Sequence, residues 1–337
     1  IRPRDWSSDV CSSDLMNKQN APAYPLKTFL INNIFIFSAV IVIAAFYFIN
    51  PSFLSLYSVQ NITLEIAPLL PMALGIAFVL YTGCIDLSVG AIASATCVIT
   101  GLNVAQYGNV MIVYMLLMGA MAGLINGLLV ARLRLPSFIV TLCAQSEWRA
   151  VAIVLSQGGS ASIPLKQRVI VNWASEKVLL FPVSFWIALL LVGICLFIER
   201  KTELGKSIFV IGANEKAARL AGVNNVRIKV LAYVLCGLGA ALSGIMYTYK
   251  LKSSVPTIGD NLFMLSISAV ALGGTLFSGG RGSALRTLIG VVTVIAISSG
   301  MNMAGVDPLW KDVVFGLVLI FAVFFNSEKR SKDLIIK

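Results

Sequence analysis

Long apolar runs, separated by short polar segments, dominate the chain from residue 29 to residue 326. The runs have 16–21 residues, and helices of that length cross the roughly 30 Å hydrocarbon core of a bilayer at about 1.5 Å per residue. The pattern predicts an all-α integral membrane protein, a polytopic bundle of about ten transmembrane helices. The predicted spans are 29–49, 62–80, 84–100, 110–130, 137–156, 180–198, 230–248, 262–277, 284–302 and 309–326.

Three of these runs carry signs of irregularity. Run 62–80 contains Pro68 and Pro71, which predicts a kink because proline removes a helix hydrogen bond. Runs 84–100 and 262–277 are short and bounded by glycine, so either is a candidate for a partial or broken helix.

Composition excludes several classes of protein. Apolar residues make up 58% of the chain and charged residues 12%, against about 25% charged in a soluble domain. A soluble enzyme and a disordered chain are both excluded by this hydrophobicity. The chain has no histidine, which removes histidine bases and histidine metal ligands. The six cysteines form no CxxC pair and are expected to be small buried hydrophobes.

The formal charge of +11 is best explained by membrane topology. The basic residues flank apolar runs, so a nucleic-acid groove is not indicated. With the N-terminus inside, the inner segments carry 17 Lys and Arg and the outer segments carry 6. This bias predicts that both termini, as tails 16–28 and 327–337, are cytoplasmic.

Residues 1–15, IRPRDWSSDVCSSDL, differ in character from the rest. They resemble a translated sequencing adapter and are expected to be non-native, so that the natural chain begins at Met16. The segment lacks the apolar core of a signal peptide, and the first apolar run would then act as an uncleaved anchor.

The connection 199–229 is the longest one predicted to lie inside, and it contains a short helical pattern. Asn214 is a favourable N-cap, and Gly222 is a favourable C-terminal cap after a run of alanine and leucine. A helix of fewer than about 12 residues is marginal in isolation. The sequence therefore predicts that this helix docks onto a partner.

Polar residues inside the apolar runs are the candidates for a transport role. Asp86, in GCIDLSVGA, is either a cap of the helix that begins at Leu87 or Ser88, near the membrane interface, or a residue of the translocation pathway together with Ser88. Glu147 and Arg149 lie about ten residues inside run 137–156 and do not face each other on a helix. They belong either to a structural polar network or to a substrate or conformational site.

Two glycine patterns have simpler interpretations. Gly119, Gly123 and Gly127 recur at four-residue spacing, which predicts close helix packing. The segment GGTLFSGGRGS lacks the Gly-Lys-Ser/Thr of a phosphate loop, so a tight turn with Arg281 at the cytoplasmic surface is expected.

Four motifs together resemble a known family. GCIDLSVGAIAS, LPSFIVTL, ELGKSIFVIGANEKAARLAGVNNVRIKVLAYVLCG and LGGTLFSGGRGSALRTLIG occur in the order seen in the ribose-type sugar permeases of bacterial ABC importers. The resemblance covers about 29–326. Arg286 and the polar stretch CAQSEWRA depart from the family pattern.

The resemblance implies how this chain would work. It implies a transmembrane permease domain over 29–326 in the bacterial inner membrane, a second permease copy or paralogue, a pair of cytoplasmic ATPase subunits and an extracytoplasmic solute-binding protein. It also implies that Glu215 holds the acidic place and Gly222 the terminal glycine of the loop motif. The ATPase-coupling helix would comprise Asn214, Glu215, Lys216, Ala217, Ala218, Arg219, Leu220, Ala221 and Gly222.

The implied function is import of a ribose-like monosaccharide, with ATP and Mg bound by the ATPase partner and no cofactor or metal bound by this chain. The chain would thus be a transport subunit without enzymatic activity of its own. A permease for branched-chain amino acids, nucleosides or a furanosyl signal molecule has the same architecture. An ion-coupled secondary transporter is a rival of another class, for which Glu147 and Asp86 would be the essential acids. An integral membrane enzyme is disfavoured because no nucleophile–base pair or metal set is present.

Overall fold

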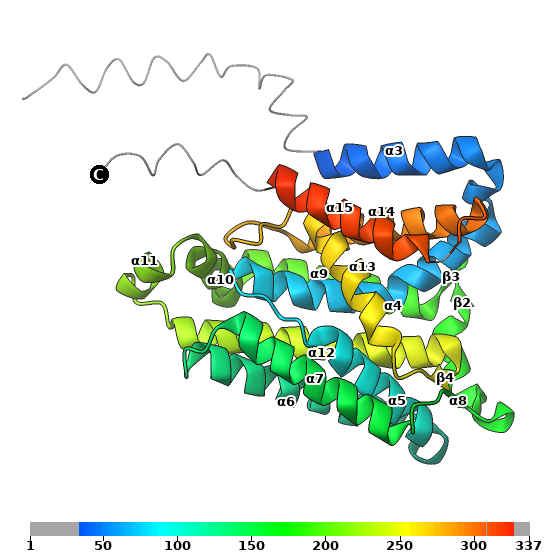
Figure 1. The fold of residues 1–337 in the computed structure, drawn as a ribbon, viewed down its shortest axis with the longest axis horizontal. Coiled ribbons are helices and arrows are strands. Elements are labelled where there is room, and N and C mark those ends of the chain that lie inside the picture. The colour runs from blue at the N-terminus through cyan, green and yellow to red at the C-terminus, as the bar shows by residue number, and fades with distance from the viewer. Residues whose placement is uncertain (1–33, 308, 327–337) are drawn as a thin grey trace, which may run out of the picture.

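The computed structural model describes residues 34–307 and 309–326, and within them each predicted span overlaps a helix (Figure 1). Residues 1–15, the tail 16–28, the start of the first run and the tail 327–337 lie outside the described residues. The helices that correspond to the runs are α3 (Ile34–Ile49), α4 (Leu56–Tyr81), α5 (Val89–Tyr107), α6 (Met111–Ala131), α7 (Ser137–Leu155), α9 (Val183–Lys201), α12 (Asn225–Leu251), α13 (Ile258–Leu272), α14 (Ala284–Met303) and α15 (Trp310–Asn326).

Short elements connect these helices. Strand β1 (Ala161–Ser162) pairs antiparallel with β4 (Ser253–Ser254), and β2 (Lys177–Val178) pairs with β3 (Phe181–Pro182). The other connecting helices are η2 (Pro51–Leu54), η3 (Gly108–Val110), η4 (Leu165–Gln167), α8 (Val169–Asn172), η5 (Trp173–Ser175), α10 (Glu203–Ala213) and α11 (Glu215–Leu220).

Helices α4 and α12 form the centre of the bundle. Every residue of α4 from Ile66 to Tyr81 is buried, and α12 packs against α4, α5 and α6. A helix that is apolar on all sides becomes buried on all sides. These two helices are therefore the elements against which the others are positioned.

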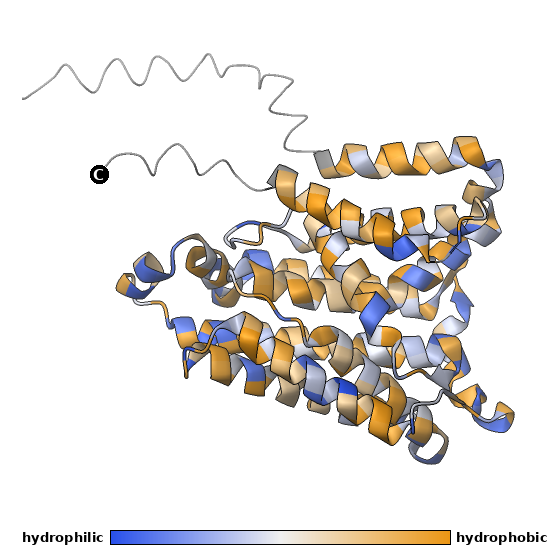
Figure 2. Cartoon of the chain, viewed as in Figure 1, coloured by the Kyte–Doolittle hydropathy of each residue, from blue (hydrophilic) through white to orange (hydrophobic). Residues whose placement is uncertain are grey.

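The peripheral helices expose their apolar side chains. Phe48 on α3 is 83% exposed and Val154 on α7 is 73% exposed, and hydrophobic residues predominate along α3 and α15 in Figure 2. A water-soluble protein does not present such extensive apolar surface, whereas lipid tails accept it. The all-helical structure and its apolar exterior identify a multi-pass membrane protein.

Six helical stretches are long and apolar enough to cross a membrane by length and composition: Leu56–Tyr81, Val89–Ala131, Ser137–Leu155, Val183–Lys201, Asn225–Leu251 and Ala284–Met303. The second comprises both α5 and α6, which turn at Gly108 and pack together. Helices α3 and α13 are shorter apolar helices. Ten crossings therefore remain a prediction, as does the position of both termini.

Several predicted boundaries were wrong, each for a local reason. Run 84–100 becomes helical only at Val89, and residues 84–88 form a non-helical break. Run 262–277 stops at Leu272, because Gly273 and the left-handed Gly274 end the helix and begin the glycine-rich turn. The helix α4 continues through Pro68 and Pro71, and a kink at these prolines stays a prediction.

Candidate functional site

The short helix in the 199–229 connection is α11, and its ends are set by two residues. The Asn214 side-chain oxygen accepts hydrogen bonds of 3.1 Å from the backbone N–H groups of Lys216 and Ala217. After Leu220 the chain turns away through Gly222, whose φ of 84° lies in the left-handed region. Capping at both ends allows six residues to hold a helical turn that propensity alone would not stabilise.

A second helix in this connection, α10, was missed by the sequence analysis. Thr202 caps it by accepting a hydrogen bond from the Gly205 N–H at 3.2 Å, and Ile208 and Ile211 are buried. The signal was present, because Leu204, Ile208 and Ile211 follow helical spacing after a threonine N-cap. The high charge density of the segment obscured this amphipathic pattern.

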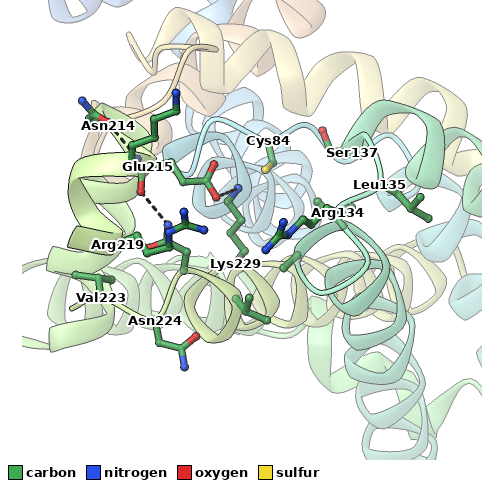
Figure 3. A pocket seen from close by; sticks show the side chains of 15 residues that line it. Cys84, Arg134, Leu135, Ser137, Asn214, Glu215, Arg219, Val223, Asn224 and Lys229 are labelled. Carbon is green, nitrogen blue, oxygen red and sulfur yellow. Dashed lines mark hydrogen bonds and ion pairs between the residues drawn. The ribbon is translucent and has the colours of Figure 1, made fainter. Parts of the chain in front are cut away.

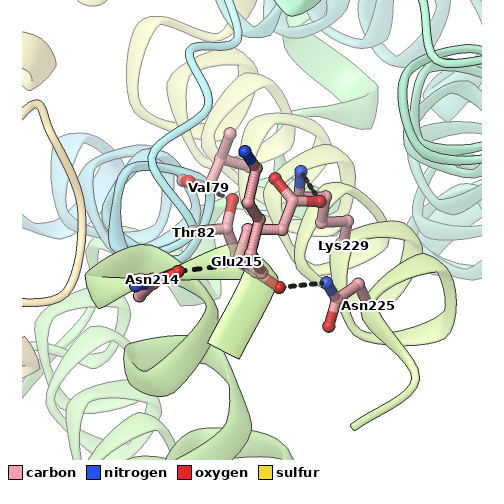
Figure 4. Close-up of polar contacts among 7 residues, drawn as sticks. Val79, Thr82, Asn214, Glu215, Asn225 and Lys229 are labelled. Carbon is pink, nitrogen blue, oxygen red and sulfur yellow. Dashed lines mark hydrogen bonds and ion pairs between the residues drawn. The ribbon is translucent and has the colours of Figure 1, made fainter. Parts of the chain in front are cut away.

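Glu215 holds α11 against the first turn of α12 (Figure 4). Its Oε1 lies 2.8 Å from the Lys229 Nζ, and its backbone carbonyl accepts a hydrogen bond of 2.9 Å from the Asn225 side chain. Lys229 is largely buried while Glu215 is half-exposed. An exposed ion pair of this kind contributes less than about 1 kcal/mol, so it orients α11 more than it stabilises the fold.

The end of α10, just before α11, is fixed by close backbone contact. A Cβ at Gly212, near the end of α10, would lie 1.9 Å from the Tyr81 carbonyl oxygen and 2.3 Å from the Gly280 nitrogen. The Gly280 N–H donates a hydrogen bond of 2.9 Å to the same Tyr81 carbonyl. The glycine-rich turn between α13 and α14 therefore lies against both the end of α4 and the end of α10, and α10 leads directly into α11. We call this contact of Gly212 with Tyr81 and Gly280 the Gly212 junction.

The opposite face of α11 is open. Leu220 is 91% exposed, although it is an apolar side chain on a helix that contacts the bundle elsewhere. Ala218 faces inward and is buried. The side of α11 that carries Leu220 is therefore uncovered among the residues that the structure describes.

Asp86 lies in the break between α4 and α5 and is 2% exposed, while its expected place near the membrane interface stays a prediction. Its Oδ1 accepts hydrogen bonds from the Ser88 backbone N–H at 2.9 Å and from the Ser88 hydroxyl at 2.6 Å. Ser88, not Asp86, occupies the cap position of α5, because the helix starts at Val89. The Asp86 Oδ2 has no hydrogen-bond partner within the described residues.

Asn126 of α6 completes this buried group by donating to the Ser88 hydroxyl at 2.9 Å. The sequence did not predict this contact, because nothing local indicates a contact across 38 residues. The three glycines lie against α12: a Cβ would be 2.4 Å from the Gly237 oxygen at Gly119, 2.2 Å from the Tyr233 oxygen at Gly123 and 2.9 Å from the Val230 Cα at Gly127.

Glu147 and Arg149 do not contact each other, as their spacing predicts, and both are exposed on α7. Arg149 pairs instead with Asp260 at the start of α13, with 3.1 Å between Nη2 and Oδ2 and side chains 51% and 40% exposed. Within the part of the chain that the structure describes, Glu147 has no ion-pair or hydrogen-bond partner. The Asp260 partner was missed because the two residues are remote in sequence.

Comparison with known proteins identifies the family of this chain. Residues 58–323 match the family described as the permease component of the branched-chain amino acid transport system. The chain belongs to this family. All four motifs quoted above fall inside the matched residues.

Several proteins that are similar to this chain are named for the solute that they import. The ribose import permease protein RbsC of Escherichia coli K12 is 30% identical over 91% of this chain and 97% of its own length. RbsC of Bacillus subtilis is 35% identical over 84% and 88%. The fructose import permease protein FrcC of Rhizobium meliloti is 32% identical over 97% and 94%. No solved structure matches this chain.

Proposed function

We propose that the chain is the transmembrane permease subunit of an ATP-binding cassette importer and that it moves a monosaccharide. The observation that carries the proposal is the similarity, over most of the chain, to permeases named for ribose and fructose import. Exposed apolar helices around a tightly packed centre supply the membrane domain that such a subunit requires.

Helix α11 is the proposed coupling helix. Three features support a role for α11 as the contact for a cytoplasmic ATPase subunit: both of its ends are capped, Glu215 pairs with Lys229 of α12, and Leu220 is exposed. An exposed apolar side chain on a pre-oriented helix loses little conformational entropy on docking. ATP and Mg are bound and hydrolysed by that partner in this proposal, so the permease needs no cofactor and performs no chemistry.

Motion would reach the bundle through the contacts of α11. Closure of an ATPase dimer displaces α11, the Gly212 junction carries the displacement to the end of α4, and the Glu215–Lys229 pair carries it to α12. Because α4 and α12 form the centre of the bundle, their movement changes access from one side of the membrane to the other.

The translocation pathway is proposed to involve two groups of polar residues. Asp86 and Ser88 are buried at the break that directly follows α4, with one carboxylate oxygen unpaired. Glu147 and Arg149 are exposed on a membrane helix, where lipid contact would cost about 2.5–3.5 kcal/mol per charge. We propose that a second permease copy or paralogue, or a water-filled path between two copies, covers this face.

The proposal places the chain in a bacterial inner membrane, and the charge bias supports both tails, 16–28 and 327–337, in the cytoplasm with an even number of crossings, ten, between them. An extracytoplasmic binding protein would deliver the sugar to the outer surface. Weak, uncharged contacts in the permease then suffice, because the binding protein selects the solute.

A second solute class has one specific observation in its favour. The family description names branched-chain amino acids, whereas the similar proteins name ribose and fructose. The coupling proposal holds for either solute class.

The deciding experiment is reconstitution with a candidate ATPase subunit and a candidate extracytoplasmic binding protein from the same organism. We expect the ATPase to co-purify with the permease and ribose uptake to require ATP. Uptake of leucine but not of ribose would show that the solute is a branched-chain amino acid and not a monosaccharide. Uptake by the permease without any ATPase, driven by an ion gradient, would refute the importer proposal in favour of a secondary transporter.

A further inference from the structure

A cavity of about 940 Å³ lies between α11, the first turn of α12 and the connection from α6 to α7 (Figure 3). Its lining includes four basic residues: Arg134, Lys216, Arg219 and Lys229. The single acidic residue in the lining is Glu215, and it is already paired with Lys229. Three positive charges of the lining are therefore left without an acid.

These three basic side chains have no ion pair with any residue that the structure describes. Like charges that line a concave surface add their potentials and attract anions. Arg134 also has a φ of 57°, a left-handed conformation that costs a non-glycine residue energy, and its side chain extends into the cavity in Figure 3. The cavity is thus suited to an anionic occupant.

The connection from α6 to α7 adds apolar residues to the lining beside Arg134. Val130 and Leu135 lie at the end of α6 and just before α7, and Leu133, which does not line the cavity, is 62% exposed. In the proposed orientation these helix ends lie at the inner membrane surface. The basic residues would then lie near the level of the lipid phosphates, and Val130 and Leu135 would be available to the upper part of an acyl chain. A free phosphate would engage only the basic residues.

We infer that this cavity binds the phosphate group of an anionic phospholipid of the inner leaflet. The inference rests on the proposed orientation but not on the identity of the solute. Basic cavities between helices on the cytoplasmic side are a recurrent form of lipid headgroup site.

Leu220, the proposed ATPase contact, is not part of this cavity. Glu215, Lys216 and Arg219 are spaced to lie near one another on the helix and line the cavity. Leu220, one turn beyond Lys216, does not line it and is 91% exposed. A bound lipid would hold α11 to the membrane while leaving Leu220 accessible to a partner.

The test is binding of phosphatidylglycerol to the full permease chain in detergent, counted by native mass spectrometry. The variant is Arg134→Gln, Lys216→Gln, Arg219→Gln. The matched control is Lys201→Gln, Lys206→Gln, Arg227→Gln, which removes three exposed basic residues of the predicted inner side that do not line the cavity. At about 1 kcal/mol per basic residue, we expect roughly 150-fold weaker lipid binding in the variant and unchanged binding in the control.

Separate additions identify the source of the phosphate. Phosphatidylethanolamine and inorganic phosphate, each added alone, are expected to bind far more weakly than phosphatidylglycerol. Equal binding by variant and control would overturn the inference, and so would displacement of the lipid by equimolar inorganic phosphate. If the triple variant does not fold, Arg134→Gln alone should weaken binding about fivefold. No ATPase or uptake is needed, so the result is independent of the importer proposal.

Discussion

Gly212→Ala tests whether the glycine junction carries motion from α11 to α4. The added Cβ would lie 1.9 Å from the Tyr81 oxygen, whereas ordinary contact begins at 3.4 Å. The two segments must therefore separate by roughly 1.5 Å. Both nearest atoms, on Tyr81 and Gly280, belong to the backbone, so no side-chain rotation can relieve the contact.

Overpacking of this kind costs about 1–3 kcal/mol. When about 2 kcal/mol of that cost falls on only one of two access states, their ratio changes about thirtyfold. We expect sugar uptake to fall at least about tenfold for this reason. ATPase binding should persist, because the exposed face around Leu220 is unchanged.

The assay is uptake of labelled ribose into proteoliposomes, with ATP hydrolysis measured in the same sample. The control is Gly193→Ala on α9, where an added Cβ meets nothing within 4 Å; it should leave uptake intact and gain up to about 1 kcal/mol of helix stability. Wild-type uptake by Gly212→Ala, or equal losses in both variants, would refute the junction as a transmission element.

Three further predictions concern neighbouring contacts. Leu220→Ala should weaken ATPase binding about tenfold, measured by biolayer interferometry, through loss of an apolar anchor; unchanged affinity would remove α11 as the docking helix. Glu215→Lys and Lys229→Glu should each uncouple hydrolysis from uptake, and the double variant should recover at least half of the coupling if their ion pair acts within the chain. Asp86→Asn keeps an oxygen for the Ser88 donors and should fold normally, yet slow uptake about tenfold; undiminished uptake would leave Asp86 a structural role alone.

The helical membrane architecture was predictable because it depends on quantities that are local in the chain. Apolar runs of sufficient length locate helices wherever the backbone must satisfy its own hydrogen bonds in lipid. Asn214 and Gly222 marked the ends of α11 for the same reason, since capping involves residues a few positions apart. The amphipathic spacing in α10 was equally local but was concealed among charged residues.

The site contacts depended on distance in space. Arg149 with Asp260, Asn126 with Ser88, and Gly212 with Tyr81 and Gly280 each join segments that are remote along the chain. The burial of Asp86 likewise depends on tertiary structure, because neighbouring helices decide whether the residues of a helix break are buried or exposed. No periodicity encodes which helices become neighbours.

The amino-acid sequence by itself determined where helices form, which surfaces are apolar and the motifs that indicate a permease, because these follow from local hydrogen bonding and transfer of side chains into lipid. Tertiary structure decided that α4 and α12 lie at the centre, that Glu215 turns inward to Lys229, and that three unpaired basic residues surround one cavity. Packing of helices brings remote charges and backbones together, and only their positions in space show which charges are neutralised and which remain available to a partner.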